Sequence, residues 1–123
     1  MSLVVQKFGG TSVANAEKIH LAAKRIIAAK QRGNQIVAVV SAMGQTTDEL
    51  LALAHQVCEN PPKRELDQLL ATGEVVTIAL MAMAIHSQGH PSISYTGGQI
   101  GLVTDESFSK ARIQSINKQR ILD

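Results

Sequence analysis

Apolar residues follow two different patterns in the first third of the chain. Leu3–Phe8 and Ile36–Val40 are short apolar runs rich in β-branched residues, and Ile36–Val40 is uninterrupted, as expected of a parallel strand buried on both faces. Between them, from about residue 14 to residue 32, apolar residues recur at helical spacing: Ile19, Ala22, Ala23, Ile26 and Ile27. Strand, helix and strand in this order predict a right-handed βαβ unit with parallel strands. Ser12 or Asn15 can cap the helix, and Gly33 can end it.

The middle of the chain predicts two further helices. Thr46 and Glu49 have the spacing of a capping box, so a helix is expected to begin near Thr47 and to end at a Pro-Pro break. Its predicted inward residues are Leu50, Leu51, Leu53, Ala54 and Val57. A second helical pattern runs from about residue 63 to residue 87 and can be interrupted at Gly73. The apolar stretch within it predicts a core helix.

The last part of the chain predicts short strands. Residues 92–95 read as one strand, residues 97–98 as a turn and residues 100–103 as a returning strand. Residues 111–116 are expected to form another short strand, and Asn117 to cap a final helix. The pattern as a whole predicts an α/β fold.

Composition narrows the class of protein. A length of 123 residues predicts one domain, and the 45% apolar and 18% charged residues are typical of a soluble globular chain. One Tyr, two Phe and no Trp give no aromatic platform for nucleic acid, and the net charge is only +2. The single Cys58 cannot form an internal disulfide, which favours a reducing compartment, and a buried thiol is expected.

No targeting or membrane segment is expected. The N-terminus lacks the pattern of a signal peptide. The longest uncharged apolar run, Val75 to Ile85, has 11 residues, whereas a membrane span needs about 20. A cytoplasmic location is therefore predicted.

The first candidate site is the segment from Lys7 to Ser12. Gly9 and Gly10 follow a predicted strand and precede a helix, so their N–H groups can face an anion beside the positive end of the helix dipole. Lys7 adds a cation, and Thr11 and Ser12 add hydroxyl donors. Together they form a candidate binding site for polyphosphate, although a plain strand-to-helix turn with a solvated lysine explains the same residues.

The second candidate is the loop from Ser41 to Thr47. It also follows the carboxyl end of a predicted strand, where open parallel sheets bind ligands, so it should face the same crevice as Lys7. The hydroxyls of Ser41, Thr46 and Thr47 can bind a carboxylate or a phosphate there. Helix capping alone is the alternative, and it accounts for Thr46.

The third candidate is Glu74, the one charge in an apolar helical stretch. An unpaired buried carboxylate is costly, so Glu74 either lies on an exposed edge of its helix or meets a cation such as a substrate ammonium. His20, His55, His86 and His90 lack metal-ligand spacing, and no metal site is predicted. The P-loop signature and the Rossmann fingerprint are also absent from the sequence.

Five segments, in order, match one family. They are Lys7–Ser12 (KFGGTS), Val39–Gly44 (VVSAMG), Thr46–Leu51 (TTDELL), Leu69–Glu74 (LLATGE) and Tyr95–Gly101 (YTGGQIG). On these motifs the chain resembles the N-terminal part of the catalytic domain of aspartate kinases, in the amino-acid-kinase superfamily. The resemblance covers essentially all of residues 1–123.

The resemblance implies a three-layer α/β/α sandwich with a mainly parallel central sheet. It implies transfer of the γ-phosphoryl group of MgATP to the side-chain carboxylate of L-aspartate. The residues implied to contact the ATP phosphates are Lys7, Phe8, Gly9, Gly10 and Ser12. The residues implied to border aspartate are Ser41, Thr47, Glu74, Gly98 and Gln99, with Glu74 on the substrate ammonium. Lys7 and Glu74 are the expected catalytic residues.

Length is where the chain departs from the family. Aspartate kinases continue with a nucleotide-binding part, which carries most magnesium contacts, and then with ACT-type regulatory domains. By the family pattern neither is present in these 123 residues, so the expectation is a truncated fold that is inactive alone. An exposed sheet edge would then favour a homo-oligomer or pairing with the remainder of the enzyme.

Two alternatives stay open. The first is another kinase of the same fold, acting on glutamate, acetylglutamate or a nucleoside monophosphate. The second is a non-catalytic module that associates with itself through a bare apolar face.

Overall fold

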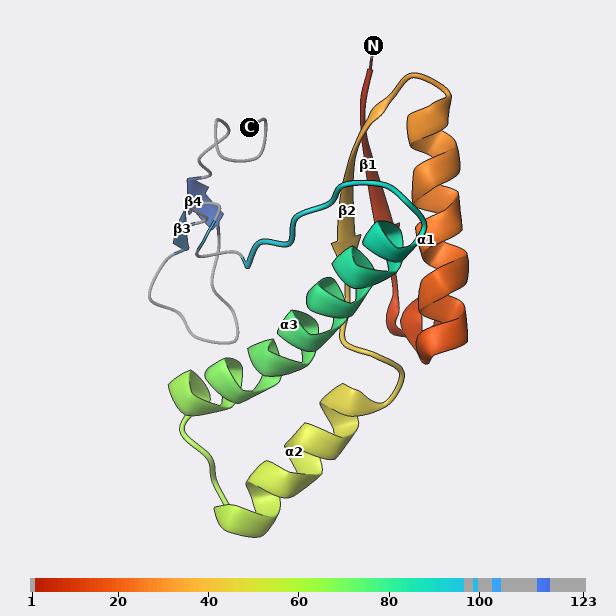
Figure 1. Cartoon of the computed structure of the whole chain (residues 1–123). Coiled ribbons are helices and arrows are strands. Elements are labelled where there is room, and N and C mark those ends of the chain that lie inside the picture. Colours follow the sequence, from red (N-terminus) through yellow and green to blue (C-terminus); the bar gives the residue numbers. More distant parts are fainter. Residues whose placement is uncertain (1, 97–98, 100–102, 105–112, 116–123) are drawn as a thin grey trace.

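A computed structural model describes residues 2–96, 99, 103–104 and 113–115. Its elements, in chain order (Figure 1), are β1 (Leu3–Phe8), the 3-10 turn η1 (Gly10–Val13), α1 (Ala16–Gln31), β2 (Gln35–Val40), α2 (Thr46–Val57), α3 (Lys63–Ser87), β3 (Val103–Thr104) and β4 (Ile113–Ser115). Strands β1 and β2 are parallel and in register from Leu3 opposite Gln35 to Phe8 opposite Val40. The predicted βαβ unit and the α/β class are confirmed.

Local side-chain chemistry sets both ends of α1. Asn15 is the cap, because its side-chain oxygen accepts a hydrogen bond from the backbone N–H of Lys18 at 2.9 Å. Gly33 follows the helix with a φ of +95°, a left-handed conformation that favours glycine. The Asn34 side chain then donates to the carbonyl of Ala29 at 3.0 Å, which closes the turn into β2.

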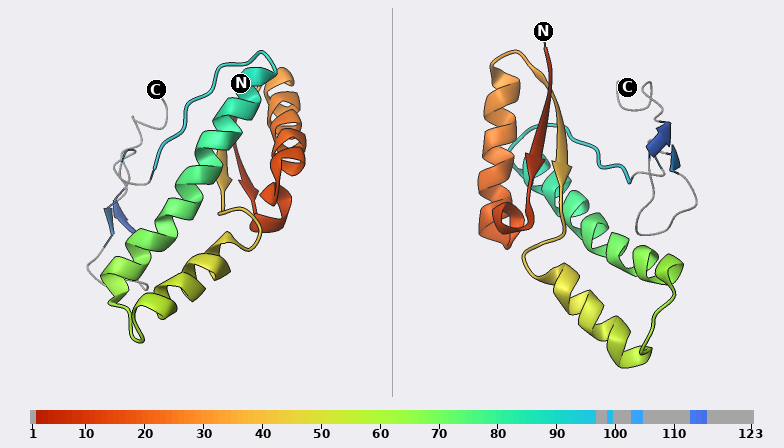
Figure 2. Two further views of the ribbon diagram at one scale, coloured as in Figure 1. Left: turned by 60° about the horizontal axis from the view of Figure 1, so that its bottom comes forward. Right: turned by 180° about the vertical axis from the view of Figure 1, so that it is seen from behind.

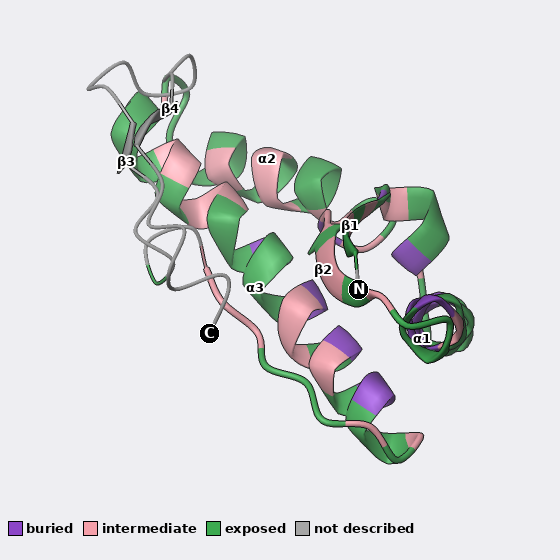
Figure 3. Cartoon of the chain, turned by 90° about the horizontal axis from the view of Figure 1, so that it is seen from above, coloured by how far each residue is buried: buried purple, intermediate pink, exposed green. Residues whose placement is uncertain are grey.

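The core lies between one face of the sheet and helices α1 and α3. Alternate residues of β2, Ile36, Ala38 and Val40, pack against a buried cluster that also contains Phe8 from β1. Helix α1 supplies half of this cluster, and α3 adds Met81, Ala84 and Ile85. Figure 3 shows the buried residues of α1 and α3 along one side of each helix. Packing of these apolar side chains against α1 and α3 therefore holds β1 and β2 in place.

The opposite face of the sheet is open. Leu3, Val5 and Val39 are 48%, 64% and 48% exposed, and seen from behind no described helix crosses β1 and β2 (Figure 2, right). The expectation that residues 36–40 are buried on both faces was wrong for the described part of the chain. The reason is that α1 and α3 both pack on the same face, so only one helical layer covers these strands.

Helix α2 differs from its prediction in three ways. The capping box does not form, because Gln45 is the N-cap and makes no side-chain cap hydrogen bond. None of the residues of α2 is buried, and its predicted inward residues Leu53 and Val57 are 51% and 82% exposed. Cys58, expected to be buried, follows α2 and is exposed. The helix packs on α3 along one side only (Figure 3), which leaves the rest of its apolar surface in solvent.

Helix α3 is continuous through Gly73 and is only partly a core helix. Val75, Val76 and Met83 are 44%, 52% and 64% exposed, so the predicted core stretch buries one face rather than all of it. The helix is also long and apolar enough to cross a membrane: the mean hydropathy of its best 18-residue window is 1.7, and 22% of that window is buried. Partly buried helices of globular proteins share these properties.

The last part of the chain agrees with the predictions only in places. Residues 92–95 form no strand; instead the Ser92 hydroxyl donates to the carbonyl of Ala82 at 2.7 Å, which holds this segment against α3. Strand β4 falls within the predicted strand at 111–116, and it pairs antiparallel with β3. Most of the predicted strand at 100–103 and the whole predicted helix after Asn117 lie outside the described residues.

Replacing Asn15 by Ala removes the cap of α1 and is expected to lower the free energy of unfolding by about 1 kcal/mol. Ser12→Ala is the matched control, because Ser12 makes no cap hydrogen bond to α1, and it should cost under about 0.5 kcal/mol. Urea unfolding followed by circular dichroism at 222 nm measures both. An equal loss for the two variants would contradict the assignment of the cap.

Candidate functional site

The two predicted site segments that follow β1 and β2 lie at one end of the sheet. Strands β1 and β2 run in the same direction, and η1 and the loop to α2 follow their carboxyl ends (Figure 1). Gly9 precedes η1 in an extended conformation, and its carbonyl accepts a hydrogen bond from the backbone N–H of Ser12 at 3.0 Å. The chain therefore turns at the paired glycines.

Two backbone hydrogen bonds join the loops that follow β1 and β2. The N–H of Ser41 donates to the carbonyl of Phe8 at 3.1 Å, and the N–H of Gly44 donates to the carbonyl of Gly10 at 3.0 Å. A Cβ atom on Gly10 would lie 3.1 Å from the carbonyl oxygen of Ala42, so a larger residue would press on this oxygen and glycine favours the close approach. The prediction that both loops share one edge of the sheet is confirmed.

Helix α3 reaches the same loop at Gly73. A Cβ atom on Gly73 would lie 3.0 Å from the Cβ of Ala42 and 3.3 Å from the Cγ2 of Thr46. Glycine in a helix interior weakens the helix, and here it allows the helix backbone to lie directly against the loop. Buried Ala42 is thus in close contact with both Gly10 and Gly73. Three segments far apart in the sequence converge at this alanine.

The candidate side chains differ in their exposure. Lys7 is exposed and belongs to the face of β1 opposite Phe8, whose side chain is in the core. A phosphate contact by Phe8 would therefore use its backbone. Ser41 is half-buried, whereas Thr47 and Glu74 are exposed. Of the two explanations offered for Glu74, the structure shows an exposed helix edge, so burial gives no reason for a bound cation.

The charges near the site are not neutralised by one another. An ion pair joins Arg64 and Glu65 at 2.8 Å, at the start of α3. Lys7 and Glu74 take part in no such pair with another described residue. Both side chains are consequently available to a ligand.

The structure gives less support for Gln99 and Gly98 as parts of the site. Gln99 forms a local turn with Thr96: its side-chain oxygen accepts from the Thr96 N–H at 2.8 Å, and its own N–H donates to the Thr96 hydroxyl at 3.2 Å. Gly98 lies outside the described residues. Within those residues, no group of three or more His, Cys, Asp or Glu side chains could hold a metal ion.

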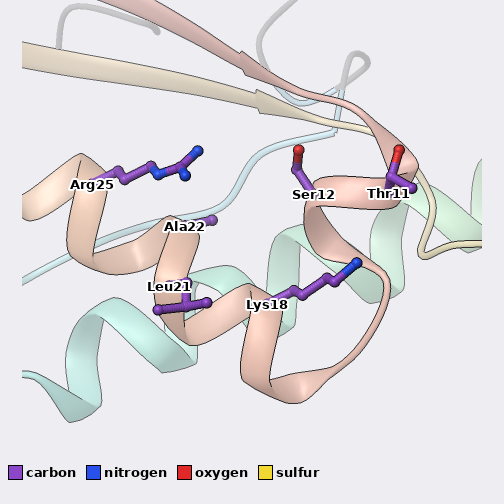
Figure 4. Close-up of a pocket in the computed structure, with 6 residues that line it drawn as sticks. All are labelled: Thr11, Ser12, Lys18, Leu21, Ala22 and Arg25. Carbon is purple, nitrogen blue, oxygen red and sulfur yellow. The ribbon is translucent and has the colours of Figure 1, made fainter.

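Sequence reasoning missed the residues that hold the site together. Ala42 and Gly73 were not among the candidates, although a glycine inside a helical pattern is a known sign of close packing. It also missed a surface hollow beside η1, which is shown in Figure 4. Its lining comes from η1 and α1: Thr11, Ser12, Lys18, Leu21, Ala22 and Arg25.

Comparison with known proteins gives one consistent group. The model of the "Amino acid kinase family" matches residues 2–123. An aspartokinase of Bacillus sp. (strain MGA3) is 55% identical over 98% of this chain and 29% of its own length. Aspartokinase 2 of Bacillus subtilis (strain 168) is 54% identical over all of this chain and 30% of its own length.

A solved structure agrees with these relatives. The crystal structure of an aspartate kinase from Synechocystis superposes with a TM-score of 0.87 at 46% identity, covering 98% of this chain and 20% of that one. This chain spans about 30% of the length of the curated relatives it matches.

Gly10→Val tests the contact between the two loops. The new side chain would press on the carbonyl of Ala42, so we expect the hydrogen bond from the Gly44 N–H to weaken and its amide hydrogen exchange to accelerate by about tenfold or more. Gly9→Val is the matched control, because a Cβ there meets nothing within 4 Å. Unchanged exchange at Gly44 in the Gly10 variant would show that the loops do not depend on this contact.

Proposed function

This chain belongs to the amino acid kinase family, and from that premise we propose that it forms the aspartate-binding and phosphate-binding part of an aspartate kinase. The reaction is transfer of the γ-phosphoryl group of ATP to the side-chain carboxylate of L-aspartate, which gives aspartyl phosphate for lysine, threonine and methionine biosynthesis. The relatives that carry the name aspartokinase support this choice.

One structural observation carries the proposal: the convergence at Ala42. The turn at Gly10 and helix α3 at Gly73 both contact this residue, which places the predicted phosphate segment and the helix of Glu74 at one loop. A phosphoryl transfer site needs its donor and acceptor held close together, because positioning supplies much of the rate enhancement. The contact supplies a rigid frame for such a site.

The chemistry requires no general base from the protein. The carboxylate of aspartate is ionised at neutral pH and is itself the nucleophile. Lys7 and the N–H groups of Gly9 and Gly10 are proposed to stabilise negative charge on the transferring phosphoryl oxygens. Ser12 and the backbone of Phe8 are proposed to complete the contacts to the ATP phosphates.

The acceptor side of the site lies across the same loop. Ser41 and Thr47 are proposed to bind the substrate through their hydroxyls. Glu74 is proposed to bind the ammonium group of the substrate by a charge-assisted hydrogen bond. Gly98 and Gln99 are proposed to border this side. An exposed Glu74 can approach a small amino acid from the solvent-facing edge of α3.

Magnesium would enter this site with ATP and neutralise phosphate charge. Among the described residues, no group of three or more His, Cys, Asp or Glu side chains could hold this ion, so the proposed roles involve no metal ligand from the protein.

We also propose a cytoplasmic location. A homo-oligomer through the uncovered side of the sheet is proposed on the exposure of Leu3, Val5 and Val39.

The test uses a chimera in which residues 1–123 replace the matching segment of Bacillus subtilis aspartokinase 2. We expect ADP release with aspartate and not with glutamate or acetylglutamate. Lys7→Ala should lower kcat by about 10²–10³-fold, as expected for loss of a group that stabilises transition-state charge. Glu74→Gln should raise the KM for aspartate by about tenfold or more through loss of a charge-assisted hydrogen bond.

Two variants serve as matched controls. Lys24→Gln removes an exposed cation of α1, and Glu65→Gln removes an exposed acid of α3, so neither should change kcat or KM. The isolated 123-residue chain, assayed beside the chimera, is expected to release no ADP above background. A chimera that prefers another acceptor, or one indifferent to both Lys7 and Glu74, would overturn the proposal.

A further inference from the structure

The hollow beside η1 is a second place where groups suited to an anion gather. It has a volume of about 340 Å³ and lies between the hydroxyl-bearing residues of η1 and one flank of α1 (Figure 4). Thr11 and Ser12 come from η1, and Lys18 and Arg25 come from α1. We call these four residues with Leu21 and Ala22 the α1 hollow.

The two cations of the α1 hollow stand about two helical turns apart on the same side of α1. Both are exposed, and neither takes part in an ion pair within the described part of the chain. Acidic side chains are missing from the lining. Because like charges repel, two unpaired cations at the rim of one hollow favour a negatively charged occupant.

The remaining lining fits an oxyanion with a small apolar part. Neither the Thr11 nor the Ser12 hydroxyl is a donor in the hydrogen bonds found among the described residues, so both can donate to an incoming oxygen. Leu21 is 52% exposed and offers an apolar wall, while Ala22 is buried and forms the floor. Phosphate oxygens accept from lysine, guanidinium and hydroxyl donors at once.

The α1 hollow lies beside the site proposed for phosphoryl transfer and is largely separate from it. Lys7, Ser41 and Glu74 do not line it. Gly10 contacts the Ser41–Thr47 loop, whereas the hollow lies where η1 faces α1. Ser12 is the one residue named for both.

We propose that the α1 hollow binds the phosphoryl group of a phosphorylated small molecule, held by Lys18 and Arg25 and oriented by the hydroxyls of Thr11 and Ser12. This inference does not depend on the proposed kinase reaction. The site would let a charged metabolite act, from the side of α1, on the turn that carries Gly9 and Gly10, with Ser12 as the one residue shared with the transfer site. Free phosphate and a phosphate ester share the chemistry that the hollow recognises.

The test is a titration of the chain, labelled with ¹⁵N and with ¹³C at its leucine methyl groups, with inorganic phosphate at ionic strength held constant with sodium chloride. We expect amide shifts centred on Thr11, Ser12 and Leu21. Lys18→Gln and Arg25→Gln should each weaken binding by roughly threefold to tenfold, the range for one exposed charge contact. A parallel titration with glycerol 3-phosphate distinguishes the ester, which should also shift Leu21 side-chain signals.

Lys24→Gln and Lys7→Ala are the controls. Lys24 carries the same charge on α1 but does not line the hollow, so its loss should leave phosphate binding unchanged. If Lys24→Gln weakened binding as much as Lys18→Gln, the effect would be general charge attraction and the proposal would fail. If Lys7→Ala abolished the shifts at Leu21, the hollow would be part of the nucleotide site, which also overturns the proposal.

The chimera with Bacillus subtilis aspartokinase 2 gives an independent measurement that needs no kinase activity. Phosphate should raise its melting temperature, and the double variant Lys18→Gln/Arg25→Gln should reduce this rise while Lys24→Gln leaves it unchanged. A rise that is as large in the double variant as in the parent chimera contradicts the proposal, whether or not the chimera phosphorylates aspartate.

Discussion

The contact of three backbone segments at Ala42 is the constraint on which the candidate site depends. Gly10 and Gly73 each lie so close to this residue that an added Cβ atom would press on it, and Ala42 itself has only a methyl side chain. Protein interiors are packed densely, so a displaced atom at such a point moves its neighbours. The turn at Gly9 and Gly10, the Ser41–Thr47 loop and the helix of Glu74 are therefore positioned as one unit, although each comes from a different part of the chain.

The uneven burial of the sheet follows from where the helices lie. Helices α1 and α3 cover the face that carries Phe8 and Val40, and the other face leaves Val5 and Val39 in solvent. Lys7 belongs to that open face, which is why its side chain is exposed at the end of a strand. The same arrangement gives the site an accessible cation and gives the molecule an apolar surface of the kind that partners cover.

Local patterns predicted the βαβ unit well, because the apolar spacing of β1, α1 and β2 and the cap at Asn15 act within a few residues. Burial on the second sheet face and along α2 was mispredicted. An apolar run shows that a surface can be covered, but coverage depends on elements elsewhere in the chain. The strand expected at 92–95 failed for a similar reason, since Ser92 bonds to α3 instead of a neighbouring strand. The contact between Ala42 and Gly73 joins residues far apart in the sequence, and a local sequence pattern does not predict which distant residue will form such a contact.

A double-mutant cycle on Gly10→Val and Gly73→Val tests the shared contact most directly. Urea unfolding gives the free energy of unfolding for the wild type, the two single variants and the double variant. If both substitutions press on Ala42, the first one displaces the Ala42 loop, and the second one then costs less free energy of unfolding. The loss in the double variant should therefore be smaller than the sum of the two single losses by more than about 0.5 kcal/mol. Losses that add within that margin would show that the two glycines act independently, and the account of a single converged site would be wrong.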